Sequence, residues 1–258
     1  MLQKKLDEAA MQGARVVASA TVLGRPAPVE HGRAIVHQVV PSLRDARARL
    51  LDLVGRTIAE LQQALRRNDL DAARGQFEAS AALLFGAMLE WRTLSAEAIK
   101  VRELIAQDMA QVQLEIARLN VIVAQRTQQA AEANAKIREH ALRTSLTWLG
   151  GPLAKLIDEI VSLAQSGGLT EMQLADGVRE LKQAQREVEN ASAASGALSA
   201  LADGMGSLAS TVQGLANTLA LAIGHMQNAV ADLTEASLLE LFVTTAIQDL
   251  EDVRRDAA

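Results

Sequence analysis

The chain has 258 residues, of which 49% are hydrophobic and 22% charged, and this apolar content excludes a disordered chain because it is sufficient for a core. Aromatic residues make up only 2% and Cys is absent, which is typical of long helices and coiled coils and excludes disulfides and thiolate metal sites. The net charge of -5 argues against nucleic acid as a partner, because phosphate binding needs clustered cations with few opposing acids.

The first third of the chain predicts short helices separated by a proline-containing loop. Residues 1 to about 20 have the pattern of an amphipathic helix, and residues 24–28 hold the glycine and prolines of a loop. A second helix is expected over residues 41–67. From residue 70 the apolar residues continue at helical spacing, with a bend expected near Thr93.

Two long helices of nearly equal length are expected over residues 96–148 and 170–225. Both carry apolar stripes, and the second keeps a spacing of three and four residues over many heptads. Glycines and a proline separate them, so the simplest arrangement is an antiparallel hairpin. A last helix is expected over residues 233–254. The fold class is therefore all-α, an elongated bundle of about five helices with two very long antiparallel ones.

The amino-terminal residues argue against a cleavable secretion signal. Lys4, Lys5, Asp7 and Glu8 form a charge cluster where such a signal has its apolar core. Export is therefore expected to use a dedicated or non-classical route.

The sequence contains no recognisable catalytic or metal-binding pattern. The four histidines are far apart, and none forms a pair with the spacing that a metal site needs. Residues 204–209 match the letters of a dinucleotide-binding turn, but a heptad stripe surrounds them where a strand and βαβ unit would be required. The chain is therefore expected to be no enzyme and to need no cofactor.

The segment between the long helices, residues 146–169, is strongly apolar. It is too short and too interrupted for an ordinary membrane span of about 20 apolar residues. Taken alone, it is interpreted as a buried turn between helices. Its large apolar residues are Trp148, Leu149, Leu153, Leu156, Ile157, Ile160, Val161 and Leu163.

Residues 190–231, the neutral run, contain a single formally charged residue, Asp203. One interpretation is a central helix covered on all sides by its neighbours. The other is a small-residue surface, with five glycines among Ala and Ser, that packs closely in lipid or rearranges. The sequence leaves both open.

The chain resembles the α-helical pore-forming toxins of the cytolysin A and haemolytic enterotoxin superfamily. The features that carry the resemblance are the long helices, the apolar segment at one end, the lack of a cleavable signal and of Cys, and the Gly/Ala/Ser-rich neutral helix. The resemblance covers most of the chain as an architecture and rests on no short motif. It implies a secreted, soluble subunit that converts to a membrane-bound form, and the chain's length looks like the smallest component of a multi-part system.

The resemblance also implies a division into a helical-bundle tail, residues 1–145 and 170–258, and an apolar head, residues 146–169. The eight large apolar residues of that segment would then bind membrane lipid. The implied partners are lipid, other toxin subunits and further copies of the chain in solution. The neutral run is an alternative location for the head. The alternative function is a non-toxic helical scaffold or coiled-coil interaction protein, of the granule-coating or secretion-translocator type.

Overall fold

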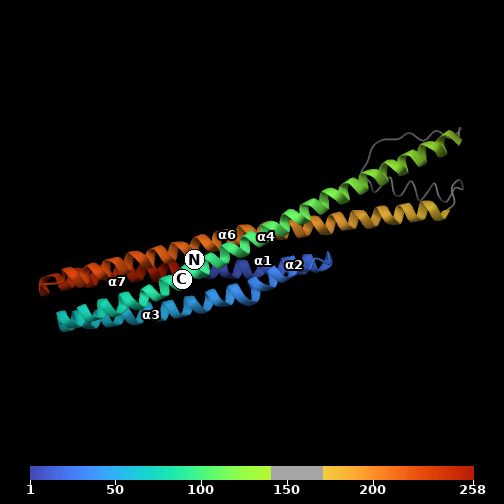
Figure 1. Cartoon of the computed structure of the whole chain (residues 1–258). Coiled ribbons are helices and arrows are strands. Elements are labelled where there is room, and N and C mark those ends of the chain that lie inside the picture. Colours follow the sequence, from blue (N-terminus) through green and yellow to red (C-terminus); the bar gives the residue numbers. More distant parts are fainter. Residues whose placement is uncertain (141–170) are drawn as a thin grey trace. The chain divides into compact units, whose positions relative to one another are not determined.

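The structure is a computed structural model that describes the backbone of residues 1–140 and 171–258 (Figure 1). Side-chain surroundings are described for residues 1–128 and 179–258, except Ala236. Every regular element in these ranges is a helix, as the composition predicts. Contacts divide the chain into two compact units: unit 1, Met1–Asp108 with Ala197–Ala258, and unit 2, Met109–Gly196.

Unit 1 begins with a helical hairpin. Helix α1 spans Leu2–Val22 and helix α2 spans Pro26–Ala34, joined by a turn in which Gly24 has a φ of 65°. The expected loop over residues 24–28 is therefore too long. Proline is tolerated in the first turn of a helix, where its missing N–H has no intrahelical partner, so Pro26 begins α2 instead of preventing it.

A π-helical turn, η1 at Ile35–Val39, joins α2 to helix α3 at Val40–Arg67. Pro41 has no N–H to donate to the carbonyl of His37, so the regular hydrogen-bond ladder is interrupted here. Helix α3 ends at Arg67. Asn68 follows with a left-handed φ of 51°, and the N–H groups of Asn68 and Asp69 donate to the carbonyls of Leu65 and Ala64.

The two long helices are α4, Leu70–His140, and α6, Glu171–Asp232. Helix α4 continues through Thr93 without a break, and the Thr93 hydroxyl donates to the Leu89 carbonyl along the helix. A short 3₁₀ turn, η2 at Ala236–Leu238, precedes helix α7 at Leu239–Ala257. Because α2, η1 and α3 follow one another directly, the described residues form five helical segments with two very long ones, and the predicted all-α fold class is confirmed.

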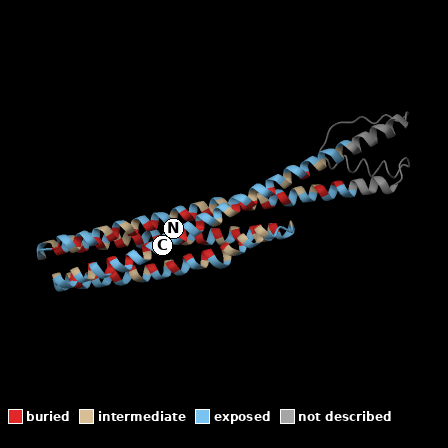
Figure 2. Ribbon diagram, in the orientation of Figure 1, coloured by how far each residue is buried: buried red, intermediate tan, exposed pale blue. Residues whose placement is uncertain are grey.

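Large apolar side chains from α1, α3, α4, α6 and α7 form the core of unit 1 (Figure 2). Each such side chain contributes about 1.5–3 kcal/mol when it leaves water. The heptad stripe predicted along α6 is buried at most of its positions. Its buried members in unit 1 are Leu198, Met205, Ala209, Val212, Ala216, Leu219, Ile223, Met226 and Leu233.

Two buried glycines set the approach of α1 to α2. A Cβ on Gly32 would lie 2.9 Å from Val17 Cγ2 and 3.0 Å from the Gly13 carbonyl oxygen. A Cβ on Gly13 would lie 3.2 Å from the Gly32 carbonyl oxygen. The helices therefore cross backbone to backbone at this pair, and a side chain at either position would separate them.

We predict that Gly32→Ala lowers the free energy of unfolding by about 1–3 kcal/mol, because the added methyl group meets a backbone oxygen that cannot move away. Urea denaturation followed by circular dichroism measures this. The control is Gly55→Ala on α3, where a Cβ meets nothing within 4 Å and alanine's helix propensity adds up to about 1 kcal/mol. Equal effects at the two sites would contradict the close crossing.

Candidate functional site

The eight predicted membrane-binding residues lie in the apolar head, residues 146–169, outside the described residues. The head's role therefore remains a prediction. The structure does describe parts of α4 and α6 and the neutral run, which was the alternative location for the head.

The neutral run is one continuous stretch of α6 with two different faces. One face is buried, with Leu208, Val212 and Leu219 fully covered. The opposite face is exposed and carries small or uncharged residues, among them Ser210 and Leu221, the latter with 64% of its surface in solvent. A helix covered on all sides is therefore the wrong interpretation, because lack of charge here accompanies exposure and not only burial.

Two glycines of the neutral run make room for long polar side chains. A Cβ on Gly204 would lie 2.1 Å from Gln12 Oε1 of α1, and a Cβ on Gly206 would lie 3.2 Å from Arg102 Nε of α4. Lys5 of α1 donates to the Ser207 hydroxyl beside them. These residues therefore serve helix packing, in keeping with the view that their resemblance to a dinucleotide turn is fortuitous.

Two histidines connect outer helices of unit 1 to the long helices. His31 Nδ1 of α2 lies 2.6 Å from Asp108 Oδ2 of α4, and the Asp108 side chain is only 5% exposed. His225 Nδ1 of α6 lies 2.7 Å from Asp249 Oδ2 of α7, in a more exposed setting. Among the described residues, no three His, Cys, Asp or Glu side chains gather to hold a metal ion.

Arginines hold the helix α3 against its neighbours. Arg44 donates to Asp7 Oδ1 of α1 over 2.6 Å, and this hydrogen bond, followed by that from Gln3, lowers the pKa of Asp7. Arg47 Nε donates to the Ala257 carbonyl of α7 over 2.6 Å. The sequence does not predict the partners of these arginines, because the contacts join residues far apart in the chain.

Buried polar atoms without a partner are few in the described part of the chain. They are Gln12 Oε1, Arg74 Nε and Trp91 Nε1. Each leaves a desolvated group unpaired, at a cost of about 1–3 kcal/mol. They lie on separate parts of unit 1 and form no shared polar site.

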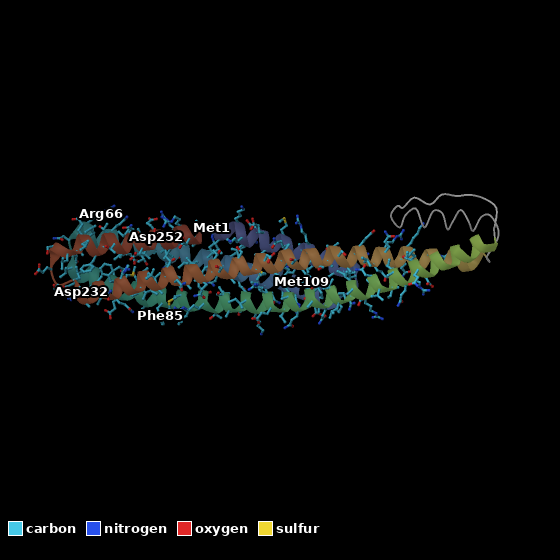
Figure 3. The ribbon with its side chains drawn as sticks, turned by 90° about the horizontal axis from the view of Figure 1, so that it is seen from above. Met1, Arg66, Phe85, Met109, Asp232 and Asp252 are labelled. Carbon is cyan, nitrogen blue, oxygen red and sulfur yellow. The ribbon has the colours of Figure 1, made fainter. Side chains whose placement is uncertain are left out.

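A shallow groove runs between α4 and α6 in unit 1. Phe85, 48% exposed, stands at its edge, on the outside of the unit (Figure 3). The sequence pattern does not predict this groove, although Phe85 and Leu89 depart from the buried stripe at a spacing of four residues. The groove's lining residues are Glu78, Ala81, Ala82, Phe85, Gln227 and Val230. No helix in the described ranges has a stretch long and apolar enough to cross a bilayer.

We predict that His31→Ala lowers the free energy of unfolding by about 1–3 kcal/mol, because it leaves the Asp108 carboxylate buried without its imidazole partner. Asp108→Asn keeps a side-chain oxygen for His31 and should cost less. The matched control is His225→Ala, since Asp249 is 21% exposed and water replaces the lost partner. Chemical denaturation of the three variants measures the free energy of unfolding of each. A larger decrease for His225→Ala than for His31→Ala would contradict the prediction.

Solved structures with a similar fold exist for this chain, whereas sequence comparison finds no match. No family model and no curated protein matches the chain. The soluble AhlC of the tripartite alpha-pore forming toxin AHL from Aeromonas hydrophila matches over 100% of this chain and 97% of its own, with 18% identity and a TM-score of 0.58. A triple head mutant of AhlC matches to the same extent. XaxB from Xenorhabdus nematophila covers 97% of this chain and 95% of its own, with 12% identity and a TM-score of 0.53. The chain therefore has the fold of a tripartite α-pore-forming toxin component, and the resemblance seen in the sequence is confirmed at the level of fold.

Proposed function

We propose that this chain is a subunit of a multi-part α-helical pore-forming toxin, and that it binds membrane through its apolar head and assembles with partner subunits. The observation that carries the proposal is the agreement in fold with soluble AhlC along almost the whole of both chains. A second solved form of AhlC is described as a head mutant, so that protein has a head to which residues 146–169 would correspond.

The chemistry of the head suits reversible membrane binding. Each large apolar side chain contributes about 1.5–3 kcal/mol when removed from water, and lipid, a partner subunit or another copy of the chain can provide that burial. The equilibrium moves to the membrane when lipid buries more of this surface than the soluble form does. The head residues involved are Trp148, Leu149, Leu153, Leu156, Ile157, Ile160, Val161 and Leu163.

The proposal includes a soluble, secreted form that self-associates before it meets a membrane. An exposed apolar head is an aggregation hazard, and pairing with another copy covers it. When lipid replaces the second copy on the head, membrane binding also changes the assembly state. The reason is that the head cannot contact lipid and another copy with the same surface.

We predict that Ile157→Glu combined with Ile160→Glu abolishes most binding to liposomes. Charge at membrane depth costs about 2.5–3.5 kcal/mol per residue, so partitioning should fall by at least about 100-fold. Flotation of protein with vesicles measures binding. Dye release, with the chain alone and with the proteins encoded beside its gene, measures pore formation.

The matched control is Leu83→Glu combined with Leu241→Glu, which makes the same change at exposed apolar positions of α4 and α7 in unit 1. This variant should bind and release dye as the unaltered protein does. Equal loss in both double variants would contradict a specific role for the head. Failure of the unaltered chain to bind vesicles in any combination of proteins would favour the helical scaffold instead.

A further inference from the structure

The outer faces of the two helices in unit 2 differ in composition. On α6, the exposed residues include Lys182, Arg186, Glu187 and Glu189, as is usual for a helix face in water. On α4 between Met109 and Gln128 the exposed residues are mostly Ala, Gln and aliphatic residues. Since both helices belong to the same unit, solvent alone does not explain why the exposed charges of α4 between Met109 and Gln128 are limited to Arg118 and Arg126.

The apolar residues of this α4 face form a regular row. Leu114 is 72% exposed and Val121, one heptad later, is 56% exposed. Val112 and Leu119, which are buried, each precede one of these residues by two positions and therefore lie on the opposite side of the helix. Spacings of four and three residues connect the members of the row. We call it the outer row: Ala110, Leu114, Ala117, Val121 and Ala124.

The borders of the outer row are also almost uncharged. Gln111, Gln113, Asn120 and Gln125 flank it, and Arg118 is the formally charged residue among the flanking positions. Single exposed apolar residues are normal on a protein surface. Five consecutive heptad positions without a charged residue are the pattern of a helix that packs against another helix.

We propose that the outer row binds the outer row of a second copy of this chain, with the two α4 helices antiparallel. One heptad position of the row holds the large residues, Leu114 and Val121, and the other holds only alanine. In antiparallel helix pairs these two kinds of position face each other, so every large side chain meets an alanine of the partner and the helices approach evenly. Parallel pairing would set large against large and alanine against alanine.

A second copy also fits the charges. The outer row is self-complementary, so a two-fold axis satisfies both copies with the same surface. A partner helix with charged borders would find no opposite charges here, apart from Arg118. Binding to a lipid surface requires exposed apolar area but does not require heptad spacing, so lipid does not explain the regular spacing of the outer row.

The size of the outer row sets the strength of the contact. From Ala110 to Ala124 the helix rises by about 21 Å, so the row is shorter than the contacts that hold permanent dimers together. We expect a reversible dimer that forms at tens of micromolar, on the order of a transient complex. The inference extends the self-association of the proposed function to a surface other than the head, and it does not rest on membrane insertion.

The first experiment compares two variants that gain the same charges at the same spacing. Leu114→Lys with Val121→Lys places two lysines in the outer row, and Gln183→Lys with Asn190→Lys places two on the charged outer face of α6. Sedimentation velocity between about 1 and 200 µM, without lipid, measures the mass. The unaltered chain and the α6 variant should dimerise alike, and the outer-row variant should dimerise at least tenfold more weakly.

The second experiment tests the orientation. The chain has no Cys, so Ala110→Cys and Ala124→Cys each introduce a unique thiol without removing a large residue of the row. Antiparallel pairing brings position 110 of one copy near position 124 of the other. A mixture of the two variants should therefore cross-link mainly between unlike chains, whereas parallel pairing would join like chains.

The head variant Ile157→Glu with Ile160→Glu separates the two proposals. Loss of dimer in this variant, with dimer retained in the outer-row variant, would overturn the outer-row contact and leave the proposed function standing. The outer-row contact would also be overturned if the unaltered chain were a monomer at every concentration. The same holds if the outer-row lysines abolished vesicle binding although the unaltered chain formed no dimer. Dimerisation through the outer row in a chain that never binds vesicles would support the contact and contradict the toxin function.

Discussion

The structure depends on the burial of an apolar heptad stripe along α6. In unit 1 this stripe runs from Leu198 to Leu233 and meets side chains of α4 and of the shorter helices, so that no short helix has to be stable alone. In unit 2 the same helix continues with Leu181, Ala184 and Ala191 buried. Small residues within the stripe allow close approach, and Gly204 and Gly206 accept long polar side chains from α1 and α4. Polar contacts such as His31 with Asp108 then fix which helix lies where.

Periodicity predicts the two long helices and the fold class, because burial of one face imposes a spacing that can be read from the sequence. Local sequence signals do not predict the structure where one residue pattern is compatible with two different local structures. Pro26 is compatible with a loop or with the first turn of α2, and tertiary packing selects the helix. Leu233 continues the α6 stripe although that helix ends at Asp232, so the predicted start of the last helix is too early. The contact of Gly13 with Gly32 and the partners of the arginines in α3 involve distant residues, and a single sequence contains no record of them.

The candidate site also has features that the sequence predicts and features that it does not. Lack of charge in the neutral run is compatible with burial on all sides or with an uncharged exposed face, and composition cannot separate the two. The structure shows a buried face and an exposed face along this run, with Asp203 as its one exposed acidic residue. The sequence does not single out the outer row of α4, because it does not say which face of α4 meets α6. Two uncharged exposed surfaces and an apolar head in one chain are consistent with a protein whose function is to change its helical and lipid neighbours.

We propose that the apolar head exchanges a protein environment for lipid while the bundle stays folded. The chain has two tryptophans, Trp148 in the head and Trp91 fully buried in unit 1, so fluorescence reports on each separately. With Trp91→Phe, emission from Trp148 is expected to shift to the blue on addition of vesicles and to be quenched by brominated lipid. With Trp148→Phe, emission from Trp91 is expected to stay unchanged and unquenched. Quenching of Trp91, or no response from Trp148 with partner proteins present, would contradict the claim.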